Sequence, residues 1–143
     1  MSVHRDILRR QFLKDANAEH MHLDPMHQDA SFRRYFRLSD ERHRRLLMDA
    51  PPPQEDLGKW IDIASHLTAI DLHPPKIFKA DQVNGFALIE DFGDNTFTKL
   101  LNDNEDPESL YGPAIDLLVH LHKHQNAVAI DIPPYDLQTL MTE

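Results

Sequence analysis

The chain has 143 residues, the size of one ordinary domain and enough to bury a hydrophobic core. It is 41% hydrophobic and 27% charged, as is typical of globular proteins, and no stretch approaches the roughly 20 consecutive apolar residues that a membrane helix requires. The formal net charge of −9 argues against a dedicated nucleic-acid-binding protein, and the absence of cysteine excludes disulfides and fits a reducing, cytoplasmic environment.

The first part of the chain predicts one helix followed by three strands. Apolar residues spaced among charges favour a short amphipathic helix over residues 3–17. Residues 21–25 alternate between apolar and polar side chains, which is typical of a short strand. The same alternation over residues 31–38 predicts a second strand with Phe32 on its apolar face, and residues 44–49 have the composition of its return partner in a hairpin.

A helix is expected next. Three prolines at 51–53 end the third strand and precede an apolar stripe with the spacing i, i+3, i+4, i+7 and i+10. The stripe consists of Leu57, Trp60, Ile61, Ala64 and Leu67. It predicts a helix that packs Trp60 in the core. Glu55 and Asp56 fall in the expected first turn, where the helix dipole favours acids.

A second hairpin and two more helices follow. Residues 77–80 and 86–89 have the pattern of strands, and the Asn-Gly pair between them is typical of a hairpin turn. A short helix near 97–101 and a longer one over 110–121 are expected after a short linker. This order predicts an α+β fold with a five-stranded antiparallel sheet, and not alternating βαβ units.

Five segments resemble one known family in both spelling and order. They are DASFRRYFRL (29–38), LLMDAPPP (46–53), WIDIASHL (60–67), PPKIF (74–78) and GFALIEDFGDNTF (85–97). The family is the bacterial branch of the aminoglycoside phosphotransferase-like superfamily that includes the cell-wall amino-sugar kinases. The resemblance implies ATP-dependent phosphorylation of a sugar hydroxyl, such as the anomeric hydroxyl of N-acetylmuramate or N-acetylglucosamine.

The resemblance also implies a division of the chain into three parts. Residues 1–19 are expected to form an N-terminal helix, and residues 20–91 a protein-kinase-like N-terminal lobe with five antiparallel strands and one helix. Residues 92–143 are expected to contain the hinge and the incomplete start of a helical C-terminal lobe. On this resemblance the chain is the N-terminal portion of a longer, cytoplasmic enzyme.

The segment 29–38 is similar to the family's phosphate-covering loop and second strand. On this resemblance four residues are candidates for binding the nucleotide: Ser31, Phe32, Arg33 and Arg34. Hydroxyl groups and arginine forks suit phosphate oxygens. The alternative is that Arg33 and Arg37 form a solvated strand face that packs over Tyr35.

Two departures from the family pattern concern the phosphates. Gln28 stands where the family usually has glycine, so the loop lacks the residue that best allows a close backbone approach. The third strand, 46–49, lacks the lysine that grips phosphates in many kinases. We expect another group to replace this lysine, and the sequence does not identify that group.

Residues 90–93, Glu-Asp-Phe-Gly, resemble the hinge that joins the two lobes in the superfamily. Backbone groups of such a hinge hydrogen-bond the edge of adenine, which makes the Glu90 carbonyl and the Phe92 N–H further candidates for nucleotide binding. The alternative is a plain strand exit with a turn glycine.

No catalytic and no metal-binding residue is predicted. The acceptor-orienting aspartate and the Mg²⁺-binding acids that phosphoryl transfer needs have no match in the sequence. We expect ATP as cofactor, Mg²⁺ only together with a C-terminal lobe, and no activity from this chain alone. His120 and His124 have the i, i+4 spacing of zinc ligands, but no third ligand is placed by spacing, so surface histidines are favoured.

Two other functions fit parts of the sequence. A non-catalytic kinase-like binding or regulatory module would explain the missing glycine and lysine. Single-stranded nucleic-acid binding could use four residues, Arg33, Arg34, Tyr35 and Phe36. The net charge of −9 opposes it. The expected partners are a nucleotide and a small sugar, with no nucleic acid and no membrane, and the apolar stripe over 110–121 predicts self-association.

Overall fold

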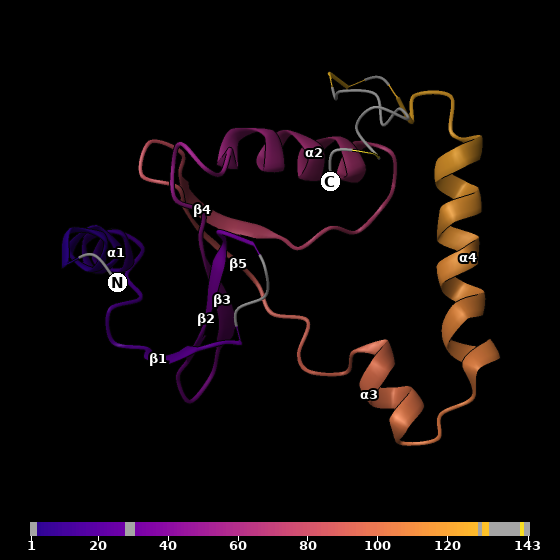
Figure 1. Ribbon diagram of the computed structural model, residues 1–143, viewed down its shortest axis with the longest axis horizontal. Helices are drawn as coiled ribbons and strands as arrows, with labels where there is room; N and C mark the ends of the chain where they lie inside the picture. Colours follow the sequence, from indigo (N-terminus) through magenta and orange to yellow (C-terminus); the bar gives the residue numbers. More distant parts are fainter. Residues whose placement is uncertain (1–2, 28–30, 129, 132–140, 142–143) are drawn as a thin grey trace.

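The computed structural model describes residues 3–27, 31–128, 130–131 and 141. The elements in order are α1 (Val3–Asp15), β1 (His22–Pro25), β2 (Arg34–Ser39), β3 (Arg44–Asp49), α2 (Leu57–Ala69), β4 (Ile77–Asp81), β5 (Phe86–Glu90), α3 (Phe97–Asn102) and α4 (Pro107–Lys123). This is the predicted α+β order, with one helix between the third and fourth strands (Figure 1).

The five strands found among the described residues form one antiparallel sheet in the order β1-β2-β3-β5-β4. β3 lies near the centre, so that Asp49 at its end is opposite both Arg34 of β2 and Phe86 of β5. Glu90, opposite Arg45, is the last residue of the β5 ladder with β3. The predicted five-stranded antiparallel sheet is confirmed.

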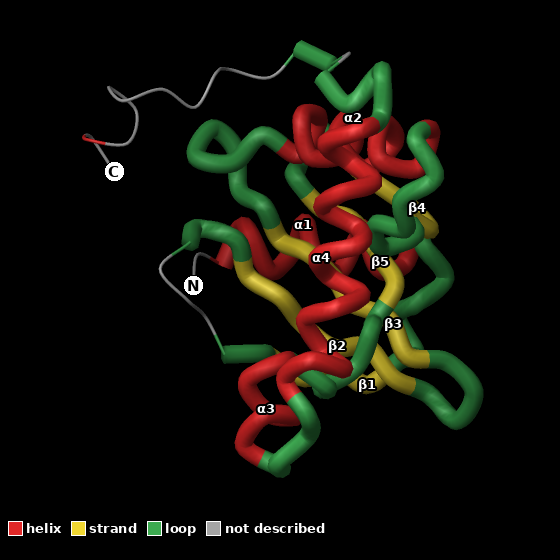
Figure 2. Tube along the Cα trace, turned by 90° about the vertical axis from the view of Figure 1, so that its right-hand side faces the viewer, coloured by secondary structure: helices red, strands yellow, loops and turns green. Residues whose placement is uncertain are grey.

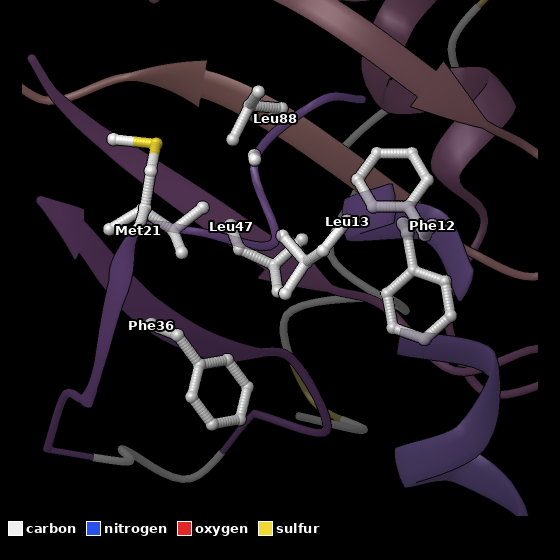
Figure 3. Close-up of a cluster of buried hydrophobic side chains, with 9 residues drawn as sticks. Phe12, Leu13, Met21, Phe36, Leu47 and Leu88 are labelled. Carbon is white, nitrogen blue, oxygen red and sulfur yellow. The ribbon is translucent and has the colours of Figure 1, made fainter. Parts of the chain in front are cut away.

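α1 covers one face of the sheet. Alternate side chains of β2, β3 and β5 meet this helix and the turn after it in a buried cluster, part of which is drawn in Figure 3. Its buried members are Phe12, Leu13, Ala18, Met21, Phe36, Leu38, Leu47, Phe86 and Leu88. The rings of Phe12 and Phe86 stack with their centroids 5.6 Å apart. The N-terminal amphipathic helix is therefore part of the core.

α2 covers the opposite face. The other set of alternate strand residues meets it in a second buried cluster, which consists of Met48, Ala50, Leu57, Ala87 and Ile89. Trp60 packs against this cluster, as its place on the stripe predicted, but it is half-buried and not one of the fully buried core residues. The Asp56 carboxylate accepts the Lys59 N–H at 3.1 Å, so the helix begins at Leu57. The prediction that Glu55 and Asp56 lie in the first turn was therefore wrong.

The start of β2 also differs from the prediction. The strand begins at Arg34, so Phe32 lies before it and is 63% exposed instead of facing the core with Phe36. The Arg33 backbone N–H donates to Ser31 Oγ at 3.1 Å. A side chain that takes up a backbone donor in this way competes with strand pairing.

α4 lies to one side of the sheet, beyond α3 (Figures 1 and 2). The structure describes all 17 of its residues, and none of them is buried. The helix begins at Pro107, earlier than predicted, because the Asp106 carboxylate accepts the Ser109 N–H as an N-cap. Within the described part of the chain, no helix is both long enough and apolar enough to span a membrane.

Two histidine side chains connect the C-terminal ends of α2 and α4. His120 Nε2 lies 3.0 Å from the Ile70 carbonyl oxygen, and His66 Nε2 lies 3.0 Å from the Ala127 carbonyl oxygen. The rings of His120 and His124, which have zinc-ligand spacing, are 5.9 Å apart. The contacts of His66 and His120 each join a side chain to a backbone carbonyl. These histidines therefore link the two helices.

Candidate functional site

One carboxylate holds the segment before β2. Ser31 Oγ donates to Glu55 Oε1 at 3.1 Å, and Arg33 Nε donates to Glu55 Oε2 at 2.6 Å. Burial opposes the charged form of Arg33, but the hydrogen bond to Glu55 and the attraction of its charge outweigh this, so the pKa of Arg33 is raised. Two side chains that the sequence nominated for phosphate binding thus meet on a single anionic group.

These contacts lie on the α2 side of the sheet. Tyr35, two residues after Arg33, packs against the second cluster with Leu57 of α2. Residues two apart in an extended segment share a face. Glu55 itself directly precedes the N-cap of α2. The Ser31–Arg33 segment and the start of α2 therefore border the same region.

Arg34 is directed to the other face, where it shares a buried carboxylate with α1. Arg34 Nη2 donates to Asp49 Oδ2 at 3.0 Å, and Arg5 Nε donates to Asp49 Oδ1 at 2.8 Å. The Asp49 side chain is completely buried, with 0% exposure. A buried carboxylate needs such cationic partners. Arg34, which the sequence analysis names as a candidate for binding the nucleotide, therefore has a clear structural role as a partner of Asp49.

Glu90 and Phe92 line an open pocket of about 760 Å³ beside α2. The C-terminal half of α2, the loop 72–76 and the start of β4 form the rest of its wall. The Glu90 N–H donates to the Lys76 carbonyl at 2.9 Å, and the Glu90 carboxylate accepts the Lys76 N–H at 3.1 Å. Phe92 is 66% exposed. The two residues nominated to meet adenine thus lie at the rim of one pocket.

Between them, Asp91 turns toward the sheet and binds arginines from two strands. Arg37 of β2 donates through Nε at 2.8 Å and through Nη2 at 3.2 Å, and Arg44 of β3 lies 3.3 Å away. Asp94 joins the group, 2.8 Å from Arg37 and 3.5 Å from Arg44. We call these four residues the hinge cluster. The Asp91 side chain is its most buried member, at 1% exposure.

The electrostatics of the hinge cluster favour the charged forms. Burial works against the Asp91 carboxylate, but hydrogen bonds from Arg37 and from the Gly93 N–H outweigh it, so the pKa of Asp91 is lowered. The hydrogen bond to Asp91 and that to Asp94 raise the pKa of Arg37. Arg33 and Arg37 are therefore bound by carboxylates rather than forming a simple solvated face over Tyr35.

The described residues do not fit a Mg²⁺ ion. Mg²⁺ takes several oxygen ligands, usually including carboxylates. Asp91 and Asp94 are each bound to two guanidinium groups. Across residues 3–27, 31–128, 130–131 and 141 no group of three or more metal-binding side chains occurs. Ser31 and Arg33, in contrast, are the kinds of donor that phosphate oxygens accept.

Sequence reasoning missed the two carboxylates that organise this region. It assigned Glu55 to a helix dipole and gave Asp91 no separate role. Arginines placed on a strand of an acidic chain are expected to find carboxylate counter-ions. This expectation was the signal that could have pointed to carboxylates near Arg33 and Arg37. The choice of partner was not predictable, since Glu55 lies 22 residues from Arg33 and Asp91 lies 54 residues from Arg37.

Comparison with known proteins supplies an independent line of information. A sequence profile described as "Phosphotransferase enzyme family" (APH) matches residues 22–140, which is most of the chain. The chain belongs to this family. The resemblance drawn from the motifs is thereby confirmed, including the amino-sugar kinase branch, to which the similar curated proteins belong by name.

Several curated phosphotransferases share the name N-acetylmuramate/N-acetylglucosamine kinase. The protein of Pseudomonas aeruginosa is 40% identical over 121 residues, covering 85% of this chain and 35% of the relative. That of Pseudomonas putida is 39% identical over 116 residues, covering 80% and 33%. That of Caulobacter vibrioides is 26% identical over 149 residues, covering 85% and 41%. The chain thus spans about a third to two fifths of the length of these relatives.

The phosphotransferase profile begins after α1. It starts at residue 22, whereas α1 spans Val3–Asp15. Phe12 and Leu13 of this helix are nevertheless buried in the first cluster, and Arg5 binds the buried Asp49. α1 therefore lies outside the segment that the profile matches, but it is an integral part of the hydrophobic core around the sheet.

Proposed function

We propose that the chain is the nucleotide-binding part of an ATP-dependent phosphotransferase that acts on a hydroxyl group of a sugar or amino sugar. Membership of the phosphotransferase family supports phosphoryl transfer. The names of the relatives, N-acetylmuramate/N-acetylglucosamine kinases, support an amino-sugar acceptor. We expect the protein to act in the cytoplasm, where ATP is plentiful.

The observation that carries the proposal is the convergence of Ser31 and Arg33 on one anion. A hydroxyl donor at 3.1 Å and a guanidinium donor at 2.6 Å bind the two oxygens of the Glu55 carboxylate. Phosphate oxygens accept from the same donors with similar geometry. The phosphates of ATP would bind here by replacing Glu55 as the acceptor.

The base would lie at the pocket beside α2. Glu90 offers a backbone carbonyl and Phe92 a backbone N–H, and both residues line this pocket. One acceptor and one donor close together match the edge of adenine, which presents a donor and an acceptor. The exposed Phe92 ring adds an apolar surface against which a base can pack.

Binding a nucleotide does not by itself accelerate phosphoryl transfer. The acceptor hydroxyl must be oriented, and charge on the moving phosphoryl group must be neutralised in the transition state. Arg33 is a candidate for part of this, but the described residues gather no acid cluster for Mg²⁺. We therefore expect this chain alone to bind nucleotide weakly and to turn none over.

A binding experiment tests the nucleotide site. In an isotope-labelled chain titrated with ATP, amide shifts are expected to cluster at residues 31–34 and 90–93. Each region contributes only part of the site, so we expect weak affinity. Shifts confined to α4, around Leu117, would contradict the assignment.

A coupled ADP-release assay tests the reaction. The 143-residue chain and a version lengthened by its native downstream sequence are assayed with N-acetylmuramate, N-acetylglucosamine and an aminoglycoside. Only the lengthened protein is expected to react, and only with Mg²⁺. In it, Arg33→Ala should lower kcat/KM by the equivalent of about 1.5–3 kcal/mol, the worth of a charged hydrogen bond. Robust turnover by the short chain would overturn the proposal that catalytic groups lie elsewhere.

A non-catalytic kinase-like binding or regulatory module is the second candidate. Two observations favour it. β3 carries no lysine, and the nearby Arg33, Arg34 and Arg37 are each bound by a carboxylate. A lengthened protein that binds ATP but phosphorylates no sugar in the panel would favour this function instead.

A further inference from the structure

We propose that Asp91 is a positioning residue for the base end of the nucleotide site, and that it acts by fixing residues 90–93 to the sheet. The inference rests on the proposed function, because it concerns the Glu90 carbonyl and the Phe92 N–H that would meet adenine. Asp91 itself would touch no nucleotide atom. Its carboxylate holds the backbone in place through hydrogen bonds from Arg37 and from the Gly93 N–H.

The need for an anchor arises where the β5 ladder ends. Glu90, opposite Arg45, is the last residue of β5 that pairs with β3. Beyond it, no strand in the described part of the chain pairs with the backbone of residues 91–93. The Asp91 carboxylate replaces that support, since it accepts from Arg37 at 2.8 and 3.2 Å through two different nitrogens. Such two-point contacts between guanidinium and carboxylate fix orientation as well as distance.

A second contact closes the turn after Phe92. The Gly93 N–H donates to Asp91 Oδ1 at 2.8 Å, and Gly93 adopts a φ of +84°, which glycine reaches without strain. Phe92 therefore lies between a residue anchored by its side chain and a residue anchored by its backbone. Its N–H direction is set by both, while its own side chain stays at the pocket rim.

Burial identifies Asp91 as the centre of the hinge cluster. Its side chain is 1% exposed, that of Arg37 is 20% exposed, and those of Arg44 and Asp94 are more than half exposed. Fixing the backbone of one residue has an entropic cost equivalent to roughly a five- to thirtyfold change in an equilibrium constant. A site that is ordered beforehand does not incur this cost on binding. Loss of the anchor should weaken base binding by about that factor.

Two separate probes distinguish the base end from the phosphate end. Adenosine and inorganic tripolyphosphate are titrated into the isotope-labelled chain, with amide shifts at 90–93 and 31–34 as the respective readouts. In Asp91→Asn the dissociation constant for adenosine should rise about five- to thirtyfold, and that for tripolyphosphate should change less than about twofold. Hydrogen exchange at the Gly93 amide should also become faster.

Asp81→Asn is the matched control. Asp81 also caps a turn, since it accepts the Asn84 backbone N–H at 3.0 Å, and its pKa is likewise lowered because the Asn84 hydrogen bonds outweigh burial. It lies at the other end of the β4–β5 hairpin, opposite Phe86. The dissociation constants of adenosine and of tripolyphosphate for Asp81→Asn should equal those for the wild-type chain.

Each outcome decides a different point. A wild-type chain that binds neither probe would refute the proposed function and the inference together. A wild-type chain that binds adenosine, with Asp91→Asn binding it equally well, would refute the positioning role alone. Equal losses for both probes would show a general structural defect and would also overturn it. If Asp91→Asn does not fold, Arg37→Lys replaces it, because lysine keeps the charge but loses the two-point contact.

Discussion

At the scale of single residues, carboxylates determine which arginine is free to exchange its partner. Arg34 and Arg37 are 21% and 20% exposed and bind carboxylates that are 0% and 1% exposed. Arg33 is 35% exposed, and its partner Glu55 is 12% exposed. Opening the Arg33–Glu55 pair therefore leaves no fully buried charge behind. Of these three arginines, Arg33 is the one best placed to bind phosphate.

Glu55→Gln should strengthen ATP binding. Glutamine has the size of glutamate. Its carbonyl oxygen can still accept from Arg33, and its amide NH2 can donate to Ser31 Oγ, but it removes a negative charge beside the triphosphate. Charge repulsion near a protein surface is screened, so we expect a modest gain, about three- to tenfold. Adenosine binding should not change. Glu41→Gln, in the exposed β2–β3 turn, is the control, and a Glu55→Gln variant that binds ATP no better than wild type would contradict the competition between Glu55 and phosphate.

Asp91 should also make the chain sensitive to acid. Its pKa in the folded state lies below the value of about 3.9 expected for unfolded aspartate. Its contribution to the free energy of unfolding is therefore complete above that value and is lost as the pH falls through the folded pKa. In urea denaturation the stability difference between wild type and Asp91→Asn should be constant from about pH 8 to pH 5 and should shrink below about pH 4. A difference that persists unchanged to lower pH would show that Asp91 stabilises by other means.

At the scale of elements, α1 is held to the sheet by a polar contact as well as by the first cluster. Arg5 binds the buried Asp49 and also donates to the carbonyls of Asn84 and Gly85 in the β4–β5 turn. Its guanidinium lies 4.0 Å from the centre of the Phe86 ring. One side chain of α1 therefore touches the end of β3, the β4–β5 turn and the start of β5.

Arg5→Ala should destabilise the chain by about 2–4 kcal/mol, because Asp49 would keep only Arg34 as a partner for its buried charge. Urea denaturation followed by circular dichroism measures the change. Arg10→Ala is the matched control, since Arg10 lies exposed on the same helix and should cost less than about 0.5 kcal/mol. A loss below about 1 kcal/mol for Arg5→Ala would mean that Arg34 alone compensates Asp49.

Elements were predictable from the sequence where their signals are local. The bounds of β3 follow from an apolar run ended by prolines, and the structure has the strand at Arg44–Asp49 as predicted. Gly85 was predicted as a turn residue. The structure gives a second reason for glycine at this position, since a Cβ would lie 1.9 Å from the Ala50 carbonyl oxygen. The sequence could not show this close approach. The exposed position of Phe32 and the role of Glu55 depend on a contact across the fold, which no local pattern encodes.

The same distinction applies to the candidate site. Resemblance to the family nominated residues by their place in a motif, and the structure brings Ser31 and Arg33 onto one anion and Glu90 and Phe92 to one pocket. It directs Arg34 to the opposite face, toward Asp49. The alternation along the strand already predicts that Arg34 lies on the face opposite Arg33. What the motif could not reveal is its partner, because Asp49 lies on another strand.

At the scale of the whole molecule, α4 presents a large apolar surface. Ile115, Leu117 and Leu118 are each 55% exposed. Together with the end of α2 and the loop 72–74, this helix borders an open apolar pocket of about 550 Å³. Apolar surface of this kind on a globular chain is usually covered by further protein.

The isolated chain should therefore associate as its concentration rises. Sedimentation velocity from micromolar to millimolar concentrations should show an increasing mean mass. Replacing both Leu117 and Leu118 by glutamate should abolish the increase. Val83→Glu is the control, because Val83 is 84% exposed in the β4–β5 turn, away from α4. A clean monomer of the wild-type chain at high concentration would contradict association through α4.

The position of Trp60 has a practical consequence for all of these measurements. It is the one tryptophan in the sequence, and it packs against the second cluster, on the α2 side of the sheet. Its fluorescence will report the loss of packing on that side. It will respond little to the detachment of α1, which lies on the other face of the sheet. If α1 detaches first in Arg5→Ala, the helical signal will fall before the emission of Trp60 shifts. Two unfolding curves that do not coincide would then locate the defect without a further structure.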